Sequence, residues 1–470
     1  MTRLPFLACA MSFLTSTTYH AAIRARQTAE AWRVGLPLIG RLRLRLKVAT
    51  LIRLATSRWG LWLLGGPTLR TRWGTLQASA THVGRALDLR CSWCLGRSTA
   101  INRAAALNLD IILRITRQGN RLSGELIVNG LVVQFAGTLS DEGIQGDLAW
   151  SDLPVRDVYD LFASAIPELR QAHIMGTIAA RGRFSLPEGK LGLNPELSGF
   201  VVRGLGTERL AWDQFRYRCA SEGAQVCRGG EQVEDWLALR DLGRWLPRAV
   251  VAAEDIRFFH HPGYDLIEAI AALQSDRDSR RFRRGGSTLT QQLARRLFLS
   301  PERTLVRKLR ETLYAVEMER TLGKKRILAL YLNTVEWGPG IRGARQAART
   351  YFDKEPGDLR PEEAAWLAAI LDNPRSAWAS EYLTGTPDLE RVAWVVGRMK
   401  GLNPVERRLA FTRPLQFTTV RPCPRPEGNT RSPKEWERAM SLTREHPRLA
   451  EASEALSPLP PPASPRSTGG

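Results

Sequence analysis

Short apolar runs separated by turn dipeptides dominate the chain between residues 105 and 200. The runs 107–115, 122–128 and 131–139 are divided by Gly119-Asn120 and Asn129-Gly130. Such runs and dipeptides are typical of antiparallel β-hairpins. A helical spacing over 154–169 is followed by a further strand pattern over 174–186. The pattern predicts a β-rich antiparallel domain, placed at 101–230, with one inserted helix.

From Trp236 the apolar spacing becomes helical and stays so to about residue 402. Ser300 followed by Pro301 is a helix-start signal, and Gly323 is a stop signal, so we expect a helix over 301–322. Further helices are expected over 324–333, 343–352 and 361–371. The predicted fold class is therefore multidomain α+β, with a mostly α-helical domain at 231–405 after the β-rich domain.

The two ends of the chain differ from these domains. Residues 1–100 form a basic region in which Leu4 to Ile23 is moderately apolar but interrupted by polar residues. An export signal or weak membrane anchor and ordinary structure are equally compatible with that stretch. Residues 406–470 are rich in proline and serine, which predicts a largely disordered tail.

The formal net charge of +21 over 470 residues calls for an anionic partner or surface. Nucleic acid, anionic lipid headgroups and diphosphates all qualify. The sequence has no aromatic-basic sheet motif or recognition-helix pattern, so we do not expect a nucleic-acid partner. Cys219 and Cys227 have the spacing of a local disulfide in an oxidising compartment, and the sequence leaves that pairing open.

Glu254 is the first candidate for chemistry. It follows the apolar run 249–253, which should raise the pKa of its carboxyl group and suit it to act as a general base. The alternative is a helix-terminal glutamate in a surface ion pair. His261, with Pro262 and Gly263 after it, is expected to shape a turn rather than to transfer protons.

A glycine-led polar segment, 285–292, follows. It lacks the Gly-Lys-Ser/Thr ending of a phosphate-binding P-loop, so a nucleotide site is not predicted. Ser287 is expected to cap a helix whose first turns present Thr288, Gln291 and Gln292.

A third segment places Arg303, Arg307 and Glu311 at i, i+4 and i+8 on one helical stripe, with Lys308 beside them. Exposed ion pairs are the plain interpretation. However, a cation near a helix N-terminus opposes the helix dipole, and Arg before Glu is the weaker orientation of a helix pair. Cations in such positions indicate an anionic ligand.

These segments resemble the family 51 peptidoglycan glycosyltransferases. The five motifs of that family fall, in order, on Glu254-Asp255 to Gly263, on 285–292, on Arg307-Lys308 to Glu311, on Lys324 to Asn333 and on 391–396. The resemblance covers about 236–402, and 335–340 looks like the monofunctional branch.

The resemblance implies a lysozyme-like helical lobe with a membrane-dipping jaw near 266–284. It also implies polymerisation of lipid II into β-1,4-linked glycan strands by inverting transfer, with release of undecaprenyl diphosphate. The expected site is the periplasmic side of the bacterial inner membrane. Glu254 would be the base and Glu311 the second catalytic residue. Glu311 would hold the donor diphosphate together with Arg303, Arg307 and Lys308 and a divalent metal (Mg2+ or Mn2+), for which Glu311 is a candidate ligand. The implied substrate-binding residues are Asp255, Phe258, His261, Ser287, Thr288, Thr290, Gln291, Gln292, Arg295, Arg303, Arg307, Lys308, Lys324 and Asn333.

One departure keeps an alternative open. Arg295-Arg296 stands where the family usually has Lys-Asn, and arginine is not a neutral replacement at a phosphate contact. The alternative is a catalytically weak scaffold that binds cell-wall synthesis proteins through the β-rich domain. A glycan-cleaving enzyme would have no use for the cations at 303–308. The expected partners are therefore lipid II, the nascent glycan strand and the membrane surface.

Overall fold

The structure is a computed structural model that describes residues 32–35, 43–46, 68–71, 74–83, 86–95, 107–141, 143–186, 190–218, 226–266, 286–300 and 304–418. The chain divides into two compact units. The first comprises Met1–Arg228 and Phe259–Ile327, and the second comprises Gly229–Phe258 and Leu328–Gly470. Each unit is described separately below.

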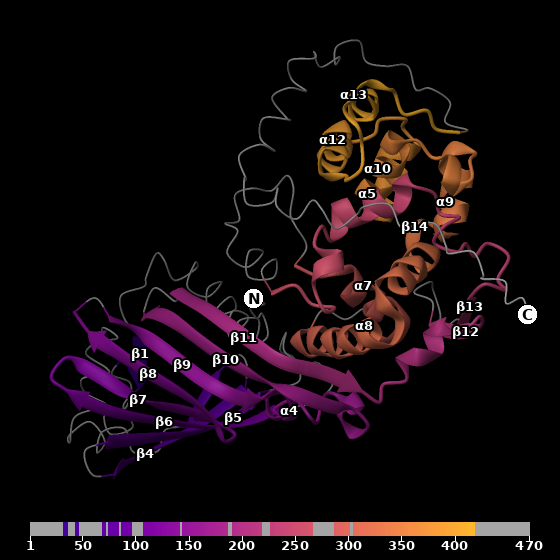
Figure 1. The fold of residues 1–470 in the computed structure, drawn as a ribbon. Helices are drawn as coiled ribbons and strands as arrows, with labels where there is room; N and C mark the ends of the chain where they lie inside the picture. Colours follow the sequence, from indigo (N-terminus) through magenta and orange to yellow (C-terminus); the bar gives the residue numbers. More distant parts are fainter. Residues whose placement is uncertain are drawn as a thin grey trace, which may run out of the picture. The chain divides into compact units, whose positions relative to one another are not determined.

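A nine-stranded antiparallel sheet forms most of the first unit (Figure 1). Each strand pairs with the next one in the sequence, as in a meander. The strands are β3 (Thr68–Thr71), β4 (Gly74–Val83), β5 (Ala86–Leu95), β6 (Leu107–Gln118), β7 (Arg121–Val128), β8 (Leu131–Leu139), β9 (Ile144–Pro154), β10 (His173–Leu186) and β11 (Lys190–Arg203). The predicted hairpins are confirmed, and the sheet also takes in residues 68–95. A separate pair, β1 (Trp32–Gly35) and β2 (Arg43–Leu46), precedes it.

The register of β7 and β8 shows why the turn dipeptides matter. Asn129 (φ 47°) and Gly130 (φ 91°) both adopt left-handed backbone conformations, as a two-residue hairpin turn requires. This turn pairs Leu126 with Val133 on one face and Glu125 with Gln134 on the other. On the apolar side the core contains Ile115, Leu122, Leu139 and Ile144.

The helix expected over 154–169 is present as two short pieces. Helix α4 (Val155–Asp160) buries Val155, Val158 and Tyr159, and a 3-10 turn η1 (Pro167–Arg170) follows. Pro167 accounts for the break, because a proline disfavours the helical conformation of the residue before it. Ile166 indeed has an extended backbone, with ψ 88°.

Two helices, α7 (Leu289–Phe298) and α8 (Leu305–Thr334), follow in the sequence. Helix α7 and the part of α8 up to Ile327 belong to the first unit. Gly323 (φ 69°) interrupts α8, so the predicted stop and restart are confirmed. The predicted start is wrong: α8 begins at Leu305 rather than at Pro301. The Thr304 hydroxyl accepts a hydrogen bond from the backbone N–H of Arg307 at 3.2 Å, which makes Thr304 the cap in place of Ser300.

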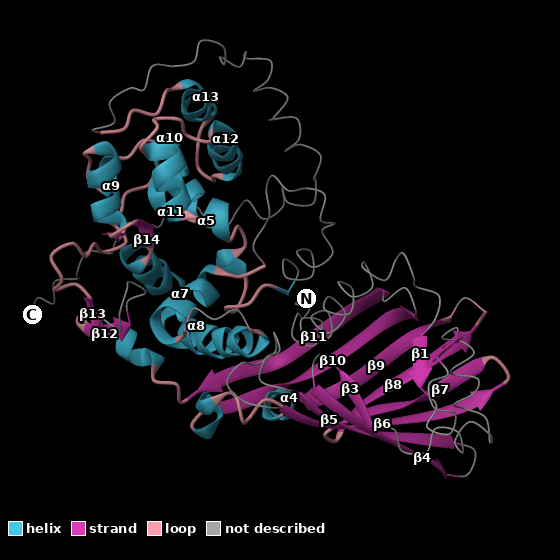
Figure 2. Cartoon of the chain, turned by 180° about the vertical axis from the view of Figure 1, so that it is seen from behind, coloured by secondary structure: helices cyan, strands magenta, loops and turns pink. Residues whose placement is uncertain are grey.

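The second unit is helical around α10 (Pro361–Ile370; Figure 2), whose residues after Pro361 are all buried. Tyr351 and Phe352 pack edge-on against Trp366 of α10. The elements are α5 (Trp245–Glu254), β14 (Glu336–Gly338), β15 (Ile341–Arg342), α9 (Ala344–Phe352), η4 (Pro356–Asp358), α10 (Pro361–Ile370), α11 (Pro374–Ala377), η5 (Trp378–Tyr382), α12 (Leu389–Arg398) and α13 (Pro404–Thr412). The short elements η2 (Thr207–Ala211), β12 (Phe215–Arg218) and β13 (Val226–Gly229) lie between the sheet and α5 in the sequence, and η3 (Phe258–His260) follows α5.

Helix α13 corrects the expectation that the tail begins at residue 406. Asn403 and Glu406 form a capping box and Pro404 occupies the first turn, so the helix start was visible in the sequence. The rest of the predicted tail, from 419 onward, lies outside the described residues. Within the described ranges, none of the helices is both long enough and apolar enough to cross a lipid bilayer.

Candidate active site

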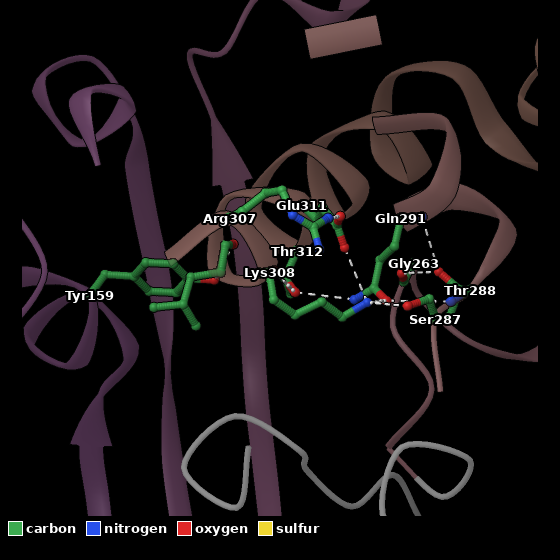
Figure 3. Close-up of polar contacts among 10 residues, drawn as sticks. Tyr159, Gly263, Ser287, Thr288, Gln291, Arg307, Lys308, Glu311 and Thr312 are labelled. Carbon is green, nitrogen blue, oxygen red and sulfur yellow. Dashed lines mark hydrogen bonds and ion pairs between the residues drawn. The ribbon is translucent and has the colours of Figure 1, made fainter. Parts of the chain in front are cut away.

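A charged cluster at the start of α8 is the most distinctive polar feature of the first unit (Figure 3). Glu311 is buried, with 1% of its surface exposed. Arg307, one turn earlier, forms an ion pair with one carboxylate oxygen, and the Lys308 ammonium lies 3.2 Å from the other. With two cations on one carboxylate, these three side chains together carry a net positive charge.

Lys308 also joins α8 to the segment before α7. Its Nζ donates hydrogen bonds to Ser287 Oγ at 2.6 Å and to Gln291 Oε1 at 2.7 Å. The Gln291 amide donates in turn to Thr312 Oγ1 at 3.1 Å (Figure 3). The fold therefore brings together the second and third sequence motifs, as an anion site built from both requires.

The local sequence explains how Ser287 reaches Lys308. The predicted cap at Ser287 is wrong: Thr288 caps α7 through a capping box with Gln291. Thr288 Oγ1 also donates to the Gly263 carbonyl at 2.7 Å, which ties the turn after His261 to α7. Because Thr288 takes the capping role, the Ser287 hydroxyl can accept from Lys308.

A second polar chain centres on Glu319, which the sequence reasoning did not single out. Glu319 Oε1 accepts from Thr290 Oγ1 at 2.6 Å and from Lys324 Nζ at 2.7 Å. Lys324 also donates to the His261 carbonyl at 2.6 Å. Glu319 thus connects residues of the first, second and fourth motifs, and its place between the third and fourth motifs was the only signal for it.

His261 has the structural role expected of it. Its Nδ1 accepts a hydrogen bond from the Gly263 backbone N–H at 3.2 Å. Gly263 has φ 91°, and an added Cβ would lie 2.8 Å from the Ala315 carbonyl oxygen, so both conformation and space require glycine here.

In the second unit, Glu254 is the last residue of α5 and is half-buried. The residues before it, Ala249, Val250 and Ala252, are buried, as the apolar run predicted. Asp255 and Phe258, which follow, are buried.

Two further residues support this part of the fold, one just after the fifth motif and one at the end of the fourth. Arg398 donates to the Ala252 carbonyl at 3.0 Å, which fixes α12, the helix of the fifth motif, against α5. Asn333 bonds both the N–H and the carbonyl of Leu237 at 2.9 Å. The amide of Asn333 therefore serves the fold, and its contact with substrate stays a prediction.

The structure shows less about the other predicted site residues. Gln292 and Arg295 are half-buried on α7, and their roles stay predictions. Arg303, Gly285 and nearly all of the expected jaw, 267–284, lie outside the described residues. Across the described part of the chain, no three His, Cys, Asp or Glu side chains gather as a metal site.

Comparison with known proteins agrees with this arrangement. A model of the family described as Transglycosylase matches residues 222–400. A relative in Nitrosomonas eutropha is 46% identical over 140 residues, which are 30% of this chain and 57% of the relative. A relative in Aeromonas hydrophila is 42% identical over 176 residues, which are 37% of this chain and 73% of the relative. A relative in Shewanella amazonensis is 44% identical over 168 residues, which are 36% of this chain and 67% of the relative. All are named biosynthetic peptidoglycan transglycosylase.

The cluster of Arg307, Lys308 and Glu311 lies within the segment that the family model matches. The chain belongs to the transglycosylase family, family 51, and resembles its monofunctional biosynthetic members. The chain spans 57% of the length of the Nitrosomonas relatives, and the sheet from β3 to β11 precedes the region that the family model matches.

Proposed function

We propose that this protein is a peptidoglycan glycosyltransferase that polymerises lipid II into β-1,4-linked glycan strands by inverting transfer. The observation that carries the proposal is the cluster of Arg307, Lys308 and Glu311 with Ser287 and Gln291. Its cations are held in place by a buried carboxylate, so their charge is available without further rearrangement. A departing diphosphate needs that kind of preorganised positive charge.

The reaction assigns a separate task to Glu254. The acceptor hydroxyl transfers its proton to the Glu254 carboxylate while its oxygen forms a bond to the anomeric carbon of the donor sugar. The bond from that carbon to the diphosphate oxygen breaks, and the electron pair leaves with undecaprenyl diphosphate. The cations of the cluster stabilise the charge that develops on the leaving oxygens.

A divalent metal ion is part of the proposal in a limited sense. Both carboxylate oxygens of Glu311 are engaged by cations, a donor set that does not fit a metal ion held by the protein alone. Mg2+ or Mn2+ would therefore enter the site bound to the diphosphate of the substrate. No step of the transfer is assigned to the metal.

We place the protein on the periplasmic side of the bacterial inner membrane. Cys227 is disulfide-bonded, which supports an oxidising compartment; Cys219, the partner expected from the sequence, lies outside the described residues. The net charge of +21 suits an anionic membrane surface.

The test is glycan-strand formation from labelled lipid II in detergent with Mg2+ or Mn2+. We expect polymer from the wild type and a rate at least about a hundredfold lower from Glu254→Gln, because general-base catalysis supplies that much. Glu234→Gln, an exposed glutamate of the same unit, is the matched control. If folded wild type made no polymer with either metal, the scaffold function through the β-rich domain would replace this proposal.

A further inference from the structure

The sheet and the helix with the charged cluster are joined by buried polar contacts. Helix α8 presents Arg307, Lys308 and Glu311 towards the start of α7. Other α8 residues, Arg310, Tyr314, Glu317, Arg320 and Thr321, contact segments of the sheet region instead. One stripe of the helix thus serves the site and another is held by the β-rich part of the same unit.

Glu168 and Arg310 form an ion pair between the sheet region and α8. Arg310 Nε and Nη2 lie 2.9 Å and 2.6 Å from Glu168 Oε1, and Glu168 is only 6% exposed. The Tyr314 hydroxyl donates to the same carboxylate at 3.3 Å. Burial, together with the neighbouring Glu168 charge, raises the pKa of Tyr314 to about 12, so the phenol stays a donor at neutral pH.

Glu317 makes the second contact, two turns further along α8. Its side chain is fully buried and accepts from the backbone N–H groups of Leu205 at 2.9 Å and Thr207 at 3.2 Å. The hydroxyls of Thr207 and Thr321 are 2.9 Å apart. These bonds fix the chain just after β11 against α8.

A third contact is made next to the cluster on α8. The Tyr159 hydroxyl of α4 donates to the backbone carbonyl of Leu309 at 3.2 Å, and Leu309 follows Lys308 in the sequence (Figure 3). At the far end of this stretch, Arg326 donates to the carbonyls of Leu210 and Trp212. Contacts along this length fix both the rotation of the helix and its position along its axis.

We infer that Glu168 and Glu317 are positioning residues, through which the sheet sets the rotation of α8 and hence the placement of Arg307 and Lys308. A rotation by one residue would move each cation by about 100° around the helix. Stability alone does not explain the Glu168–Arg310 pair, since replacing a buried ion pair with apolar residues is often neutral or stabilising. A positioning role does explain the pair, because its hydrogen bonds are directional and fix the orientation of α8 against the sheet region.

The inference rests on the proposed function, because it assigns Arg307 and Lys308 to the substrate diphosphate. It goes beyond the family assignment in one respect. Glu168, Leu205 and Thr207 lie before residue 222, where the match to the family model starts. The anion site of this protein thus depends on an element outside the matched domain.

The test compares Glu168→Gln with Glu125→Gln in the full chain. Glu125 pairs with Arg114 across β6 and β7 at 3.3 Å, so its variant loses a more exposed ion pair in the sheet without touching α8. Affinity for inorganic pyrophosphate is measured by calorimetry, and KM and kcat for lipid II are measured separately. We expect Glu168→Gln to lower pyrophosphate affinity and to raise KM by about tenfold or more, since small misplacements of binding groups have effects of that size. Glu125→Gln should leave both unchanged.

A second variant separates positioning from stability. Glu168→Leu combined with Arg310→Met removes the ion pair but fills the space with apolar atoms, so the fold should survive. Positioning predicts a folded protein, judged by its melting temperature, that still binds pyrophosphate at least about tenfold more weakly. Wild-type affinity in this double variant would overturn the inference.

The outcomes also distinguish this inference from the proposed function. A wild type that polymerises lipid II, together with a Glu168→Gln variant that matches Glu125→Gln, would overturn the positioning role alone. A wild type that neither polymerises lipid II nor binds pyrophosphate would overturn both.

Discussion

The Lys308 ammonium lies 2.6 Å from the Ser287 hydroxyl oxygen, although Lys308 belongs to α8 and Ser287 to a different motif, just before α7. This bond links the segment that starts α7 to the helix with the buried Glu311. It explains why a serine follows Gly286 and why the helix cap falls one residue later, on Thr288.

Replacing Lys308 with methionine should abolish most of the anion binding. The change keeps the length of the side chain but removes a charge that touches Glu311, Ser287 and Gln291. We expect lipid II turnover to fall by about a hundredfold, the size of effect found when a preorganised charge contact is lost. Lys325→Met, an exposed lysine on the same helix, is the control, and equal loss in both variants would contradict the assignment.

Thr288→Ala should destabilise the protein by about 1–2 kcal/mol, because it removes the cap of α7 and the bond to Gly263. Thr288→Ser keeps the hydroxyl and should retain most of the stability. Melting temperatures of the two variants and the wild type test this. A Thr288→Ala protein that melts with the wild type would show that the capping box contributes nothing.

Asn333→Ala should cost about 2–3 kcal/mol, because it leaves buried backbone groups of Leu237 without their partner. Asn333→Asp is the informative comparison. It can still accept from the Leu237 N–H but cannot donate to the Leu237 and Ala329 carbonyls. In chemical denaturation the wild type should have a higher free energy of unfolding than both variants. An Asn333→Ala protein of unchanged stability would refute the role of these hydrogen bonds.

The folded protein should lose stability as the pH rises from 10 to 12. Burial raises the pKa of Tyr314 from 10.0 to about 12, so its contribution is fully present below pH 10 and disappears as the folded phenol ionises. Tyr314→Phe cannot ionise there. The stability difference between the wild type and Tyr314→Phe should therefore shrink across this range in thermal melts, and a constant difference would contradict the prediction.

Gly323→Ala should cost about 1 kcal/mol, since only glycine adopts φ 69° without strain. An added Cβ meets nothing within 4 Å there, so the cost is conformational. Gly323→Asn should cost a similar amount, because ψ 166° lies outside the αL region that asparagine tolerates. Equal melting temperatures for the alanine variant and the wild type would show that the break in α8 is not fixed by this residue.

Local signals in the sequence were sufficient to predict most of the elements. Asn129-Gly130 marked a hairpin and Gly323 marked a helix end, because each acts through its own backbone conformation. Adjacent candidates were harder to separate. Ser287 and Thr288 can both cap a helix, as can Ser300 and Thr304, and only tertiary contacts decided between them.

The contacts between the sheet and α8 could not be predicted from the sequence. Glu168 and Arg310 are 142 positions apart, and the sequence around either residue does not indicate which residue it pairs with. Their pairing depends on how the meander curves and where α4 leaves it. Long-range pairs of buried charges are therefore found only from the structure.

The meander order of the sheet has a consequence for biosynthesis. Each strand from β3 to β11 pairs with its immediate neighbour in the sequence, so the sheet can form by successive hairpins while the ribosome is still translating later residues. Helix α8 emerges about 100 residues after β11, at about 5–20 residues per second. The sheet can thus form before the helix that packs on it, and nascent chains arrested before α8 should have a sheet as resistant to protease as chains arrested after α8.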